Sequence, residues 1–372
     1  MNKNQIKNFL INLPGWHTSK KIIVFESDDW GTIRMASRES YKRLLKKGYP
    51  VDKCAYNKND ALETNEDLEK LATVLLSVKD KNNNPAKFTL DNIVANPDFE
   101  KIKQSEFNKY YLEPFTSTLK RYKNTDRVLS LYKKGITEGV FQPQFHGREH
   151  ININRWLVSL QDHDKRFIDA FNENMFSIAV SKPPKGRRGY LDSFGENYKV
   201  EFESYDKIIK DGTDLFEKIW GFRSETFIAP CYIWSNSIEP ILKEVGINGL
   251  QGTHVQRVPV KGEDYKIRKK YHFTGQKNKH NQYYLVRNVF FEPSEKGRSG
   301  LVEQVMKEIE VSFKYKKPAI ISSHRVNFIG SIQPDNRDKN LKLLSDLLKQ
   351  IVIKYPDVEF MSSDELLMLI KK

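Results

Sequence analysis

Short runs of apolar residues alternate along the chain with longer stretches in which apolar residues recur every three or four positions. The short runs predict buried strands, and the longer stretches predict helices with one buried face. The predicted strands are 21–27, 87–95, 139–145, 176–181, 226–229, 246–250, 284–291, 318–323 and 358–361. The predicted helices are 36–45, 65–79, 155–172, 204–220, 237–245, 301–315 and 336–355.

Strand and helix follow each other repeatedly, which predicts a parallel sheet built from βα units. Seven or eight such units predict an α/β fold, a single distorted (β/α)7-8 barrel of parallel strands with long loop insertions. The insertions are 52–65, 182–203 and 253–282, and the last of these is expected to be an insertion or lid. Because no repeat or Pro-rich linker divides the chain, we expect one domain over 1–372 with a core of about 21–361.

Composition narrows the class of protein further. The chain has 372 residues, 38% of them hydrophobic, and its mean hydropathy is -0.64. It contains no run of 18 apolar residues, so no membrane insertion is expected. The apolar stretch 9–13 is too short for a signal-peptide core, and a cytoplasmic location is therefore expected. With 2 cysteines, neither a disulfide framework nor a cysteine zinc site is expected.

The net charge is +14, which favours anionic partners such as nucleic acid, acidic lipid or acidic glycan. The basic residues are spread along the chain, and no aromatic-interleaved or helix-turn-helix pattern accompanies them. We therefore expect no nucleic-acid partner, and the simplest interpretation of the charge is a solvated lysine-rich surface. A non-enzymatic protein that binds an anionic polymer stays an alternative, and strong salt dependence of binding would favour it.

Polar residues end several predicted strands, and in a parallel barrel these ends meet on the face that carries active sites. Asp28 and Asp29 end the first strand, although an isolated Asp-Asp-x-Gly is more often a helix cap and turn. His146 and His150 follow 139–145. Histidines four apart lie on one face of a helical turn and can bind one cation, or they are ordinary core or surface residues.

Two further segments end strands on the same face. Pro230, Cys231, Tyr232 and Trp234 follow 226–229, where the aromatic rings could face a sugar or simply pack in the core. His324 and Arg325 close 318–323, and a histidine at that position suits general acid catalysis or a structural hydrogen bond. The joint pattern favours an active site.

This set of motifs resembles the polysaccharide deacetylase family, the NodB-homology or carbohydrate esterase family 4 type. The matching features are Asp-Asp after the first strand, His-x-x-x-His, a Pro-containing third motif and a histidine after a late strand, spread over roughly 21–328. The resemblance implies a metal-dependent hydrolase that removes acetyl groups from an N- or O-acetylated sugar, polysaccharide or intermediate. The oligomeric state is left open.

Carried over to this chain, the resemblance implies that Asp29, His146 and His150 bind one divalent metal ion, Zn or else Fe, Co or Mn. It implies that Asp28 is the general base and His324 the general acid, with a backbone amide near Cys231 or Tyr232 facing the oxyanion. The substrate contacts expected on the rim are Trp30, Pro230, Cys231, Tyr232, Trp234 and Arg325.

Two features depart from the family pattern. The third motif of the family has an Arg two residues before its Pro, where this chain has Ile228. Arg148, Arg223 or Arg325 could substitute from elsewhere. The fourth motif, an Asp and a Trp that support the acid histidine, has no clear match at 249–254. A degenerate member that binds a glycan without turnover is therefore an alternative.

A second enzymatic alternative is a zinc peptidase. The segment 146–150 also fits His-x-x-Glu-His, in which Glu149 would be the base. That motif needs a continuous helix, but Pro143 and a predicted strand come directly before it and Gly147 lies within it. The peptidase hypothesis also gives Asp28, Asp29 and His324 no role. A non-sugar amide substrate for the same barrel is a further alternative.

Overall fold

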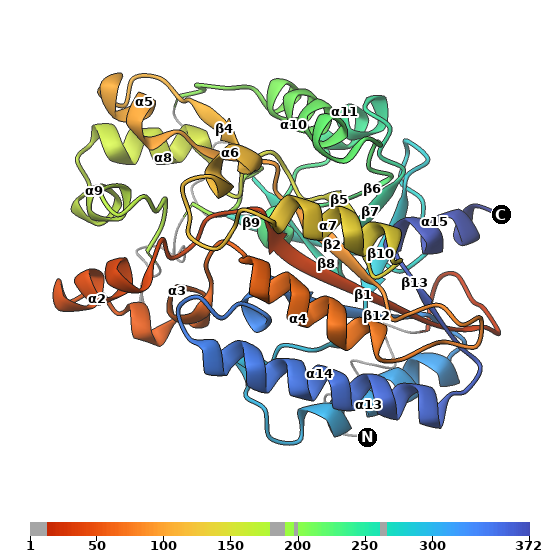
Figure 1. Cartoon of the computed structure of the whole chain (residues 1–372). Coiled ribbons are helices and arrows are strands. Elements are labelled where there is room, and N and C mark those ends of the chain that lie inside the picture. Colours follow the sequence, from red (N-terminus) through yellow and green to blue (C-terminus); the bar gives the residue numbers. More distant parts are fainter. Residues whose placement is uncertain (1–12, 179–189, 197–199, 261–265) are drawn as a thin grey trace.

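A computed structural model of the chain describes residues 13–178, 190–196, 200–260 and 266–372. Its centre is a sheet of parallel strands that curves into a nearly closed barrel (Figure 1). The strands follow the order β10-β7-β6-β5-β2-β1-β12-β11, and β13 also pairs with β1. Their bounds are β1 Lys21–Trp30, β2 Phe88–Asn92, β5 Phe141–Phe145, β6 Thr226–Ile228, β7 Gly249–Thr253, β10 Tyr283–Arg287, β11 Val289–Phe290, β12 Ala319–His324 and β13 Val358–Met361.

One continuous segment joins the two edges of this sheet. β10 pairs with β7, while β11, which begins after the single residue Asn288, pairs with β12. The Asn288 amide also donates to the Ile320 carbonyl in β12. The segment 283–290 therefore runs from one edge of the sheet to the other, and the predicted (β/α) barrel is confirmed.

Helices cover the outside of the barrel because each has one apolar face. In α14, Leu341, Leu344, Leu348 and Ile351 form the buried stripe that the sequence predicts. Figure 1 shows α13 and α14 together on one side of the sheet, with α10 and α11 on the other. The bounds are α4 Asn65–Leu76, α7 Val128–Thr137, α10 Tyr205–Trp220, α11 Ile238–Glu244, α13 Leu301–Lys314, α14 Pro334–Lys354 and α15 Ser363–Lys371.

Short elements in the loops after the strands build up the end of the barrel where β1 terminates, seen at the left of Figure 1. The helices there are α2 Arg38–Lys46, α3 Ala55–Asn59, α5 Phe99–Gln104, α6 Phe115–Leu119, α8 Ile153–Gln161 and α9 Lys165–Phe171. The other short elements are β3 Ala95–Pro97, β4 Leu112–Pro114, β8 Val255–Pro259, β9 Ile267–Tyr271 and α12 Pro293–Lys296. Two-stranded antiparallel sheets join β3 to β4 and β8 to β9.

Two local predictions, of a helix and of a strand, need correction, and one insertion proves to contain regular structure. The predicted helix 155–172 is two helices, α8 and α9, because residues around His163, whose φ is +52°, interrupt it. The insertion 253–282 contains the β8–β9 hairpin. In the predicted strand 176–181, residues 176–178 form no strand, while 179–181 and parts of the insertion 182–203 lie outside the described residues. Among the helices of the described residues, none is long and apolar enough to cross a membrane.

Candidate active site

The end of β1 presents two adjacent carboxylates to the same end of the barrel. Neighbouring side chains of a regular strand point to opposite faces of the sheet. Here the pairing of β1 with β2 shifts between Ser27 and Trp30, and Asp29 has a φ of +77°. This bulge changes the direction of the chain, as bulges beside active sites often do. Asp28 and Asp29 therefore both line one cleft.

His146 and His150 come from the loop that follows β5 and not from a helical turn, which corrects the expected conformation. Gly147, with a φ of +114°, turns the chain directly after His146. The His146 amide donates to the Asn92 carbonyl at the end of β2. The loop thereby brings the two imidazole rings to 5.2 Å between their centroids.

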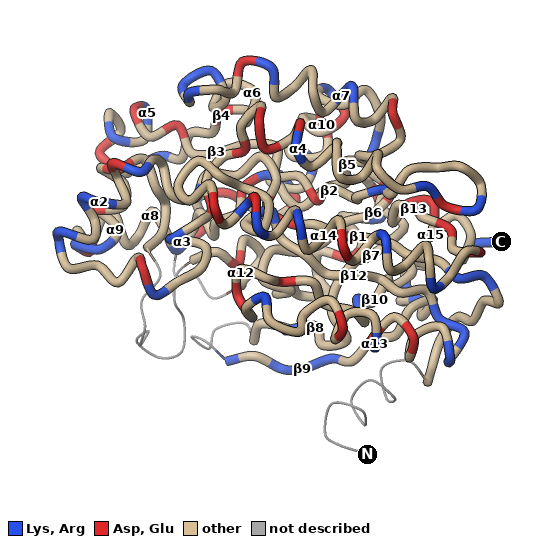
Figure 2. The backbone as a smooth tube through the Cα atoms, turned by 60° about the horizontal axis from the view of Figure 1, so that its bottom comes forward, with Lys and Arg blue, Asp and Glu red and all other residues tan. Residues whose placement is uncertain are grey.

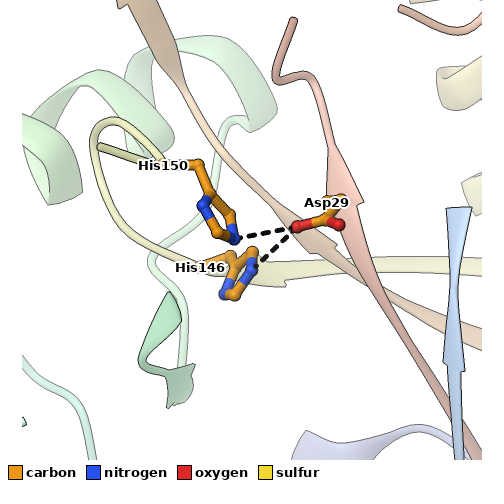
Figure 3. Close-up of side chains that lie close together, drawn as sticks. All are labelled: Asp29, His146 and His150. Carbon is orange, nitrogen blue, oxygen red and sulfur yellow. Dashed lines mark ion pairs between the residues drawn. The ribbon is translucent and has the colours of Figure 1, made fainter. Parts of the chain in front are cut away.

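Asp29, His146 and His150 converge on one point (Figure 3). Asp29 Oδ1 lies 3.5 Å from His146 Nε2 and 3.0 Å from His150 Nε2. One ligand atom of each residue lies within 4.8 Å of the others, and all three residues are buried. This is the arrangement that a divalent cation requires of two imidazoles and a carboxylate.

The chemistry of these donors fits a metal ion. His146 Nδ1 lies 2.9 Å from the Ile228 carbonyl, so Nδ1 carries the proton and the lone pair is on Nε2. His146 Nε2 is buried and has no hydrogen-bond partner among the described residues. Burial lowers the pKa of His150 to about 4, so this imidazole is neutral at pH 7. Both histidines can thus offer a lone pair.

Arg34 fixes the orientation of the Asp29 carboxylate. Its guanidinium donates to Asp29 Oδ2 at 3.0 Å, which leaves Oδ1 directed at the two histidines. Burial opposes the charged carboxylate, but Arg34 and His150 together hold the pKa of Asp29 well below its usual range. Asp29 is therefore an anion at neutral pH.

Asp28 is held by a different arginine, Arg287 in β10. Arg287 donates to Asp28 Oδ2 at 2.8 Å and to Asp28 Oδ1 at 2.5 Å, and its Nε donates to Glu26 at 2.6 Å. Burial favours the neutral acid, but the charge of Arg287 outweighs it and lowers the pKa of Asp28 to about 2. Arg287 supplies the contact expected of the missing family arginine, and Arg148, Arg223 and Arg325 do not.

His324 lies beside Asp28 and against Glu292. Its Nε2 is 3.5 Å from Asp28 Oδ2, and its Nδ1 is 2.7 Å from Glu292 Oε1. Asn327 donates to the other oxygen of Glu292 and so fixes that carboxylate. Burial disfavours the imidazolium, but Glu292 more than offsets this and raises the pKa of His324 to about 10. His324 is therefore protonated at neutral pH.

A cleft of about 630 Å³ contains these groups. Asp28, Asp29, His146, His150 and His324 lie along it, together with Cys231 and Tyr232 from the turn after β6. Tyr56 of α3 also lines the cleft, with its ring edge-on to His324 at 5.6 Å. The cleft is large enough for a sugar ring and its neighbours.

Four of the residues expected to contact substrate lie away from this cleft. Trp30 is fully buried in the core, where its indole donates to Ser27 and packs edge-on against Tyr132. Arg325 is also buried and binds Asp60 and Glu63. The Glu63 carboxylate accepts from the Gly31 amide, so Arg325 supports the turn after β1 instead of facing substrate.

Of the residues in the turn after β6, some line the cleft and others do not. Cys231 and Tyr232 line the cleft, whereas Pro230 and Trp234 are buried and do not. The Tyr232 amide donates to the Ala229 carbonyl at 2.9 Å, which removes it as an oxyanion donor. The Tyr232 hydroxyl accepts from Arg287 at 3.1 Å, so this residue also supports the guanidinium that holds Asp28.

The geometry opposes the zinc-peptidase hypothesis. Glu149 does not line the cleft, and Arg148 Nε donates to its carboxylate at 2.7 Å. Arg148 also binds Glu203 and Asp211, so the pair faces α10 and not the histidines. Burial raises the pKa of Glu149 to about 7, although Arg148 lowers it in part. The segment 146–150 is a loop and lacks the helix that the peptidase motif requires.

Sequence reasoning missed Arg34, Arg287 and Glu292. A signal for Glu292 exists, because it is the first polar residue after the predicted strand 284–291, the criterion that identifies His324. Arg287 is the charged residue inside that same apolar run. The segment 249–254, in which no clear match to the fourth motif was found, consists of β7 and His254, and Gln251 of β7 donates to Asp91 at 3.4 Å.

Comparisons with known proteins give matches among solved structures. No family model and no curated protein matches the chain. Among solved structures, one described as a polysaccharide deacetylase from Mycobacterium smegmatis has 11% identity and a TM-score of 0.44, covering 96% of this chain and 93% of its own. A similarly described Pseudomonas aeruginosa PAO1 protein has 8% identity and a TM-score of 0.45, covering 94% and 91%.

A family 4 acetyl xylan esterase from Clostridium thermocellum, solved with a cobalt ion, has 12% identity and a TM-score of 0.35, covering 94% of this chain and 91% of its own. At these values the function has to be argued from the residues of the site. The chain is thus a distorted (β/α) barrel whose cleft holds an Asp-His-His cluster beside Asp28, paired with Arg287, and His324, paired with Glu292.

Proposed function

We propose that this protein is a metal-dependent hydrolase that removes acetyl groups from an N- or O-acetylated carbohydrate. The observation that carries the proposal is the convergence of Asp29, His146 and His150 beside Asp28 and His324 in a single cleft. Each of the two flanking groups has the protonation state that its role requires, because Asp28 is an anion and His324 a cation at neutral pH.

Asp29, His146 and His150 would hold the metal, for which two imidazole nitrogens and a carboxylate suit Zn, Fe, Co or Mn. When bound, such an ion lowers the pKa of water and polarises an acyl oxygen. Arg34 keeps Asp29 Oδ1 aimed at the histidines, and the Ile228 carbonyl keeps His146 Nε2 available. We take Zn as the first ion to test.

Asp28 would accept the proton of the attacking water, since Arg287 fixes both of its oxygens next to the cleft. The water oxygen bonds to the acetyl carbon. His324 then donates its proton to the leaving nitrogen or oxygen as the bond to that carbon breaks. The products are acetic acid, which ionises to acetate, and a free amine or hydroxyl. Asp28 then releases its proton to solvent and His324 regains one from solvent, so both groups return to their starting states.

Two of the alternatives are less well supported. A peptidase would need Glu149 near the metal ligands, but Glu149 is paired with Arg148. A degenerate, non-catalytic binding protein would not require Asp28 and His324 to be held by Arg287 and Glu292. A non-sugar amide substrate and a cytoplasmic location stay open to experiment.

The test begins with elemental analysis of the purified protein and of His150→Ala. About one divalent ion per wild-type chain and its loss in His150→Ala are expected. His163→Ala is the matched control, because His163 is an exposed residue between α8 and α9 and does not line the cleft. Acetate release from N-acetyl and O-acetyl glycans should follow the metal content. A chain that binds no divalent ion, or a His150→Ala variant with full metal and turnover, would refute the proposal.

A further inference from the structure

The β8–β9 hairpin stands beside the cleft and carries a group of cations. In its antiparallel pairing, Arg257 lies opposite Lys269, and Val255 lies opposite Tyr271. Residues two apart in a strand, and residues opposite each other, share a face of the sheet. Arg257, Lys269 and Tyr271 therefore share one face, while Arg268 lies on the other.

This face continues from the cleft because Arg257 is one of the residues that line it. The hairpin is also fixed to the rest of the site. The Gln256 side chain donates to the Trp234 carbonyl at 3.0 Å, and the Trp234 amide donates to the Arg257 carbonyl at 3.3 Å. His272 Nε2 contacts Gln256 Oε1 at 2.8 Å, and the His272 ring stacks on Tyr284 of β10 at 3.6 Å. Arg257 thus has a defined place beside Cys231 and Tyr232.

The cations of this face lack acidic partners in the described part of the chain, where no carboxylate forms an ion pair with Arg257 or Lys269. Like charges directly opposite each other on a sheet are destabilising, so an anion from outside the chain would relieve the repulsion. Figure 2 shows the basic stretch along β9 at the edge of the molecule. On the other wall of the cleft, Lys53 is already paired with Asp52 at 2.7 Å, and Glu295 lies near it.

We propose that Arg257, Lys269 and Tyr271 form a subsite for an anionic sugar unit of the glycan whose acetylated unit lies at the Asp29–His146–His150 cluster. This inference rests on the proposed function, and it assigns the substrate class as an acidic glycan. The two cations suit a carboxylate or a phosphate group. Tyr271, which is 58% exposed, offers a flat ring on the same face for the pyranose itself.

The first test measures binding, which does not require turnover. The zinc-loaded full chain would be titrated with oligogalacturonate as the carboxylate ligand, poly(glycerol phosphate) as the phosphate ligand, and a neutral chitooligosaccharide. The Arg257→Gln/Lys269→Gln double variant should weaken binding of the preferred anionic oligomer about 10-fold, which corresponds to about 1.4 kcal/mol, because two solvent-exposed charge contacts are lost. Arg268→Gln, with the same charge change on the opposite face of the hairpin, should bind like the wild type.

The second test compares acetate release from acidic and neutral acetylated oligosaccharides. The double variant should raise KM for the acidic substrate by a larger factor than KM for the neutral substrate. Equal binding of anionic oligomers by wild type and double variant would overturn the subsite while leaving the deacetylase proposal intact. If the double variant loses binding but the wild type releases no acetate from any glycan, the deacetylase proposal is refuted and the subsite is supported. Tighter binding of a single-stranded oligonucleotide through the same residues would overturn the glycan assignment.

Discussion

Arg287 donates hydrogen bonds to both carboxylate oxygens of Asp28, at 2.8 Å and 2.5 Å, although 259 positions separate the two residues in the chain. The pair is buried, with only Asp28 reaching the cleft, and Arg287 also binds Glu26 and Asp91. Removing one partner of a buried ion pair leaves an uncompensated charge and is strongly destabilising. This contact keeps the proposed base ionised and pointed at the cleft.

Replacement of Arg287 by lysine tests that contact. Arg287→Lys keeps the positive charge but loses the planar fork that holds both oxygens. We expect kcat for acetate release to fall about 10- to 100-fold, while KM and the metal content stay unchanged. Arg223→Lys is the control, because Arg223 is an exposed arginine paired with Asp214 and Glu217. A wild-type kcat in Arg287→Lys would show that Asp28 needs no such positioning.

The charge of His324 gives a prediction about pH. Glu292 holds the pKa of His324 at about 10, against the opposing effect of burial. In Glu292→Gln, His324 stays buried but loses the negative charge that stabilises its imidazolium, so the pKa of His324 falls. An acid catalyst must be protonated, and therefore the alkaline decline of kcat/KM should begin at a lower pH than in the wild type. Glu303→Gln, on the exposed surface of α13, should keep the wild-type profile. An unchanged alkaline limb in Glu292→Gln would exclude His324 as the acid.

A pair of substitutions separates the deacetylase from the peptidase. Asp28→Asn removes the proposed base, and acetate release should fall by about 10²- to 10⁴-fold. Glu149→Gln breaks a buried pair with Arg148, so it should lower the free energy of unfolding but leave most of kcat. Acetate release and denaturant unfolding would be measured for both variants. A larger loss of kcat in Glu149→Gln than in Asp28→Asn would favour Glu149 as the base.

The turn after β1 is expected to be intolerant of a side chain. Gly31 has a φ of +82°, and a Cβ there would lie 2.3 Å from the Ile93 carbonyl oxygen. Gly48 has a similar φ of +86° but nothing within 4 Å of its Cβ position. Gly48→Ala should therefore cost about 1 to 2 kcal/mol of stability through backbone strain alone. Gly31→Ala should cost about 1 to 3 kcal/mol more and also lower metal affinity. Equal unfolding free energies in urea would show that the turn relaxes.

Local sequence patterns were sufficient to predict the barrel and the positions of most polar groups in the cleft. Apolar runs alternating with amphipathic stretches specify βα units, and parallel strands bring their carboxyl ends to one face. For that reason Asp28, Asp29, His146, His150 and His324 meet in the structure although the first and last are far apart in the chain. The type of each residue and its position directly after a predicted strand were enough to predict that these five side chains meet.

The same patterns failed for the aromatic residues. Trp30 follows Asp29 directly, yet the bulge and the positive φ at Asp29 direct Trp30 into the core. Trp234 and Cys231 belong to one turn, but only Cys231 lines the cleft. The side to which a side chain points depends on local backbone dihedrals, and these are set by packing against β2 and β8.

The amino-acid order therefore specified which strands form and which polar residues end them, because hydrophobic periodicity is a local property. The partners of those residues were decided only by the tertiary structure. Arg287 reaches Asp28 because β10 lies beside β12 once the barrel closes, and Glu292 reaches His324 because β11 pairs with β12. Contacts of this kind depend on strand order and register, which arise from the packing of the whole chain and leave no fixed spacing in the sequence.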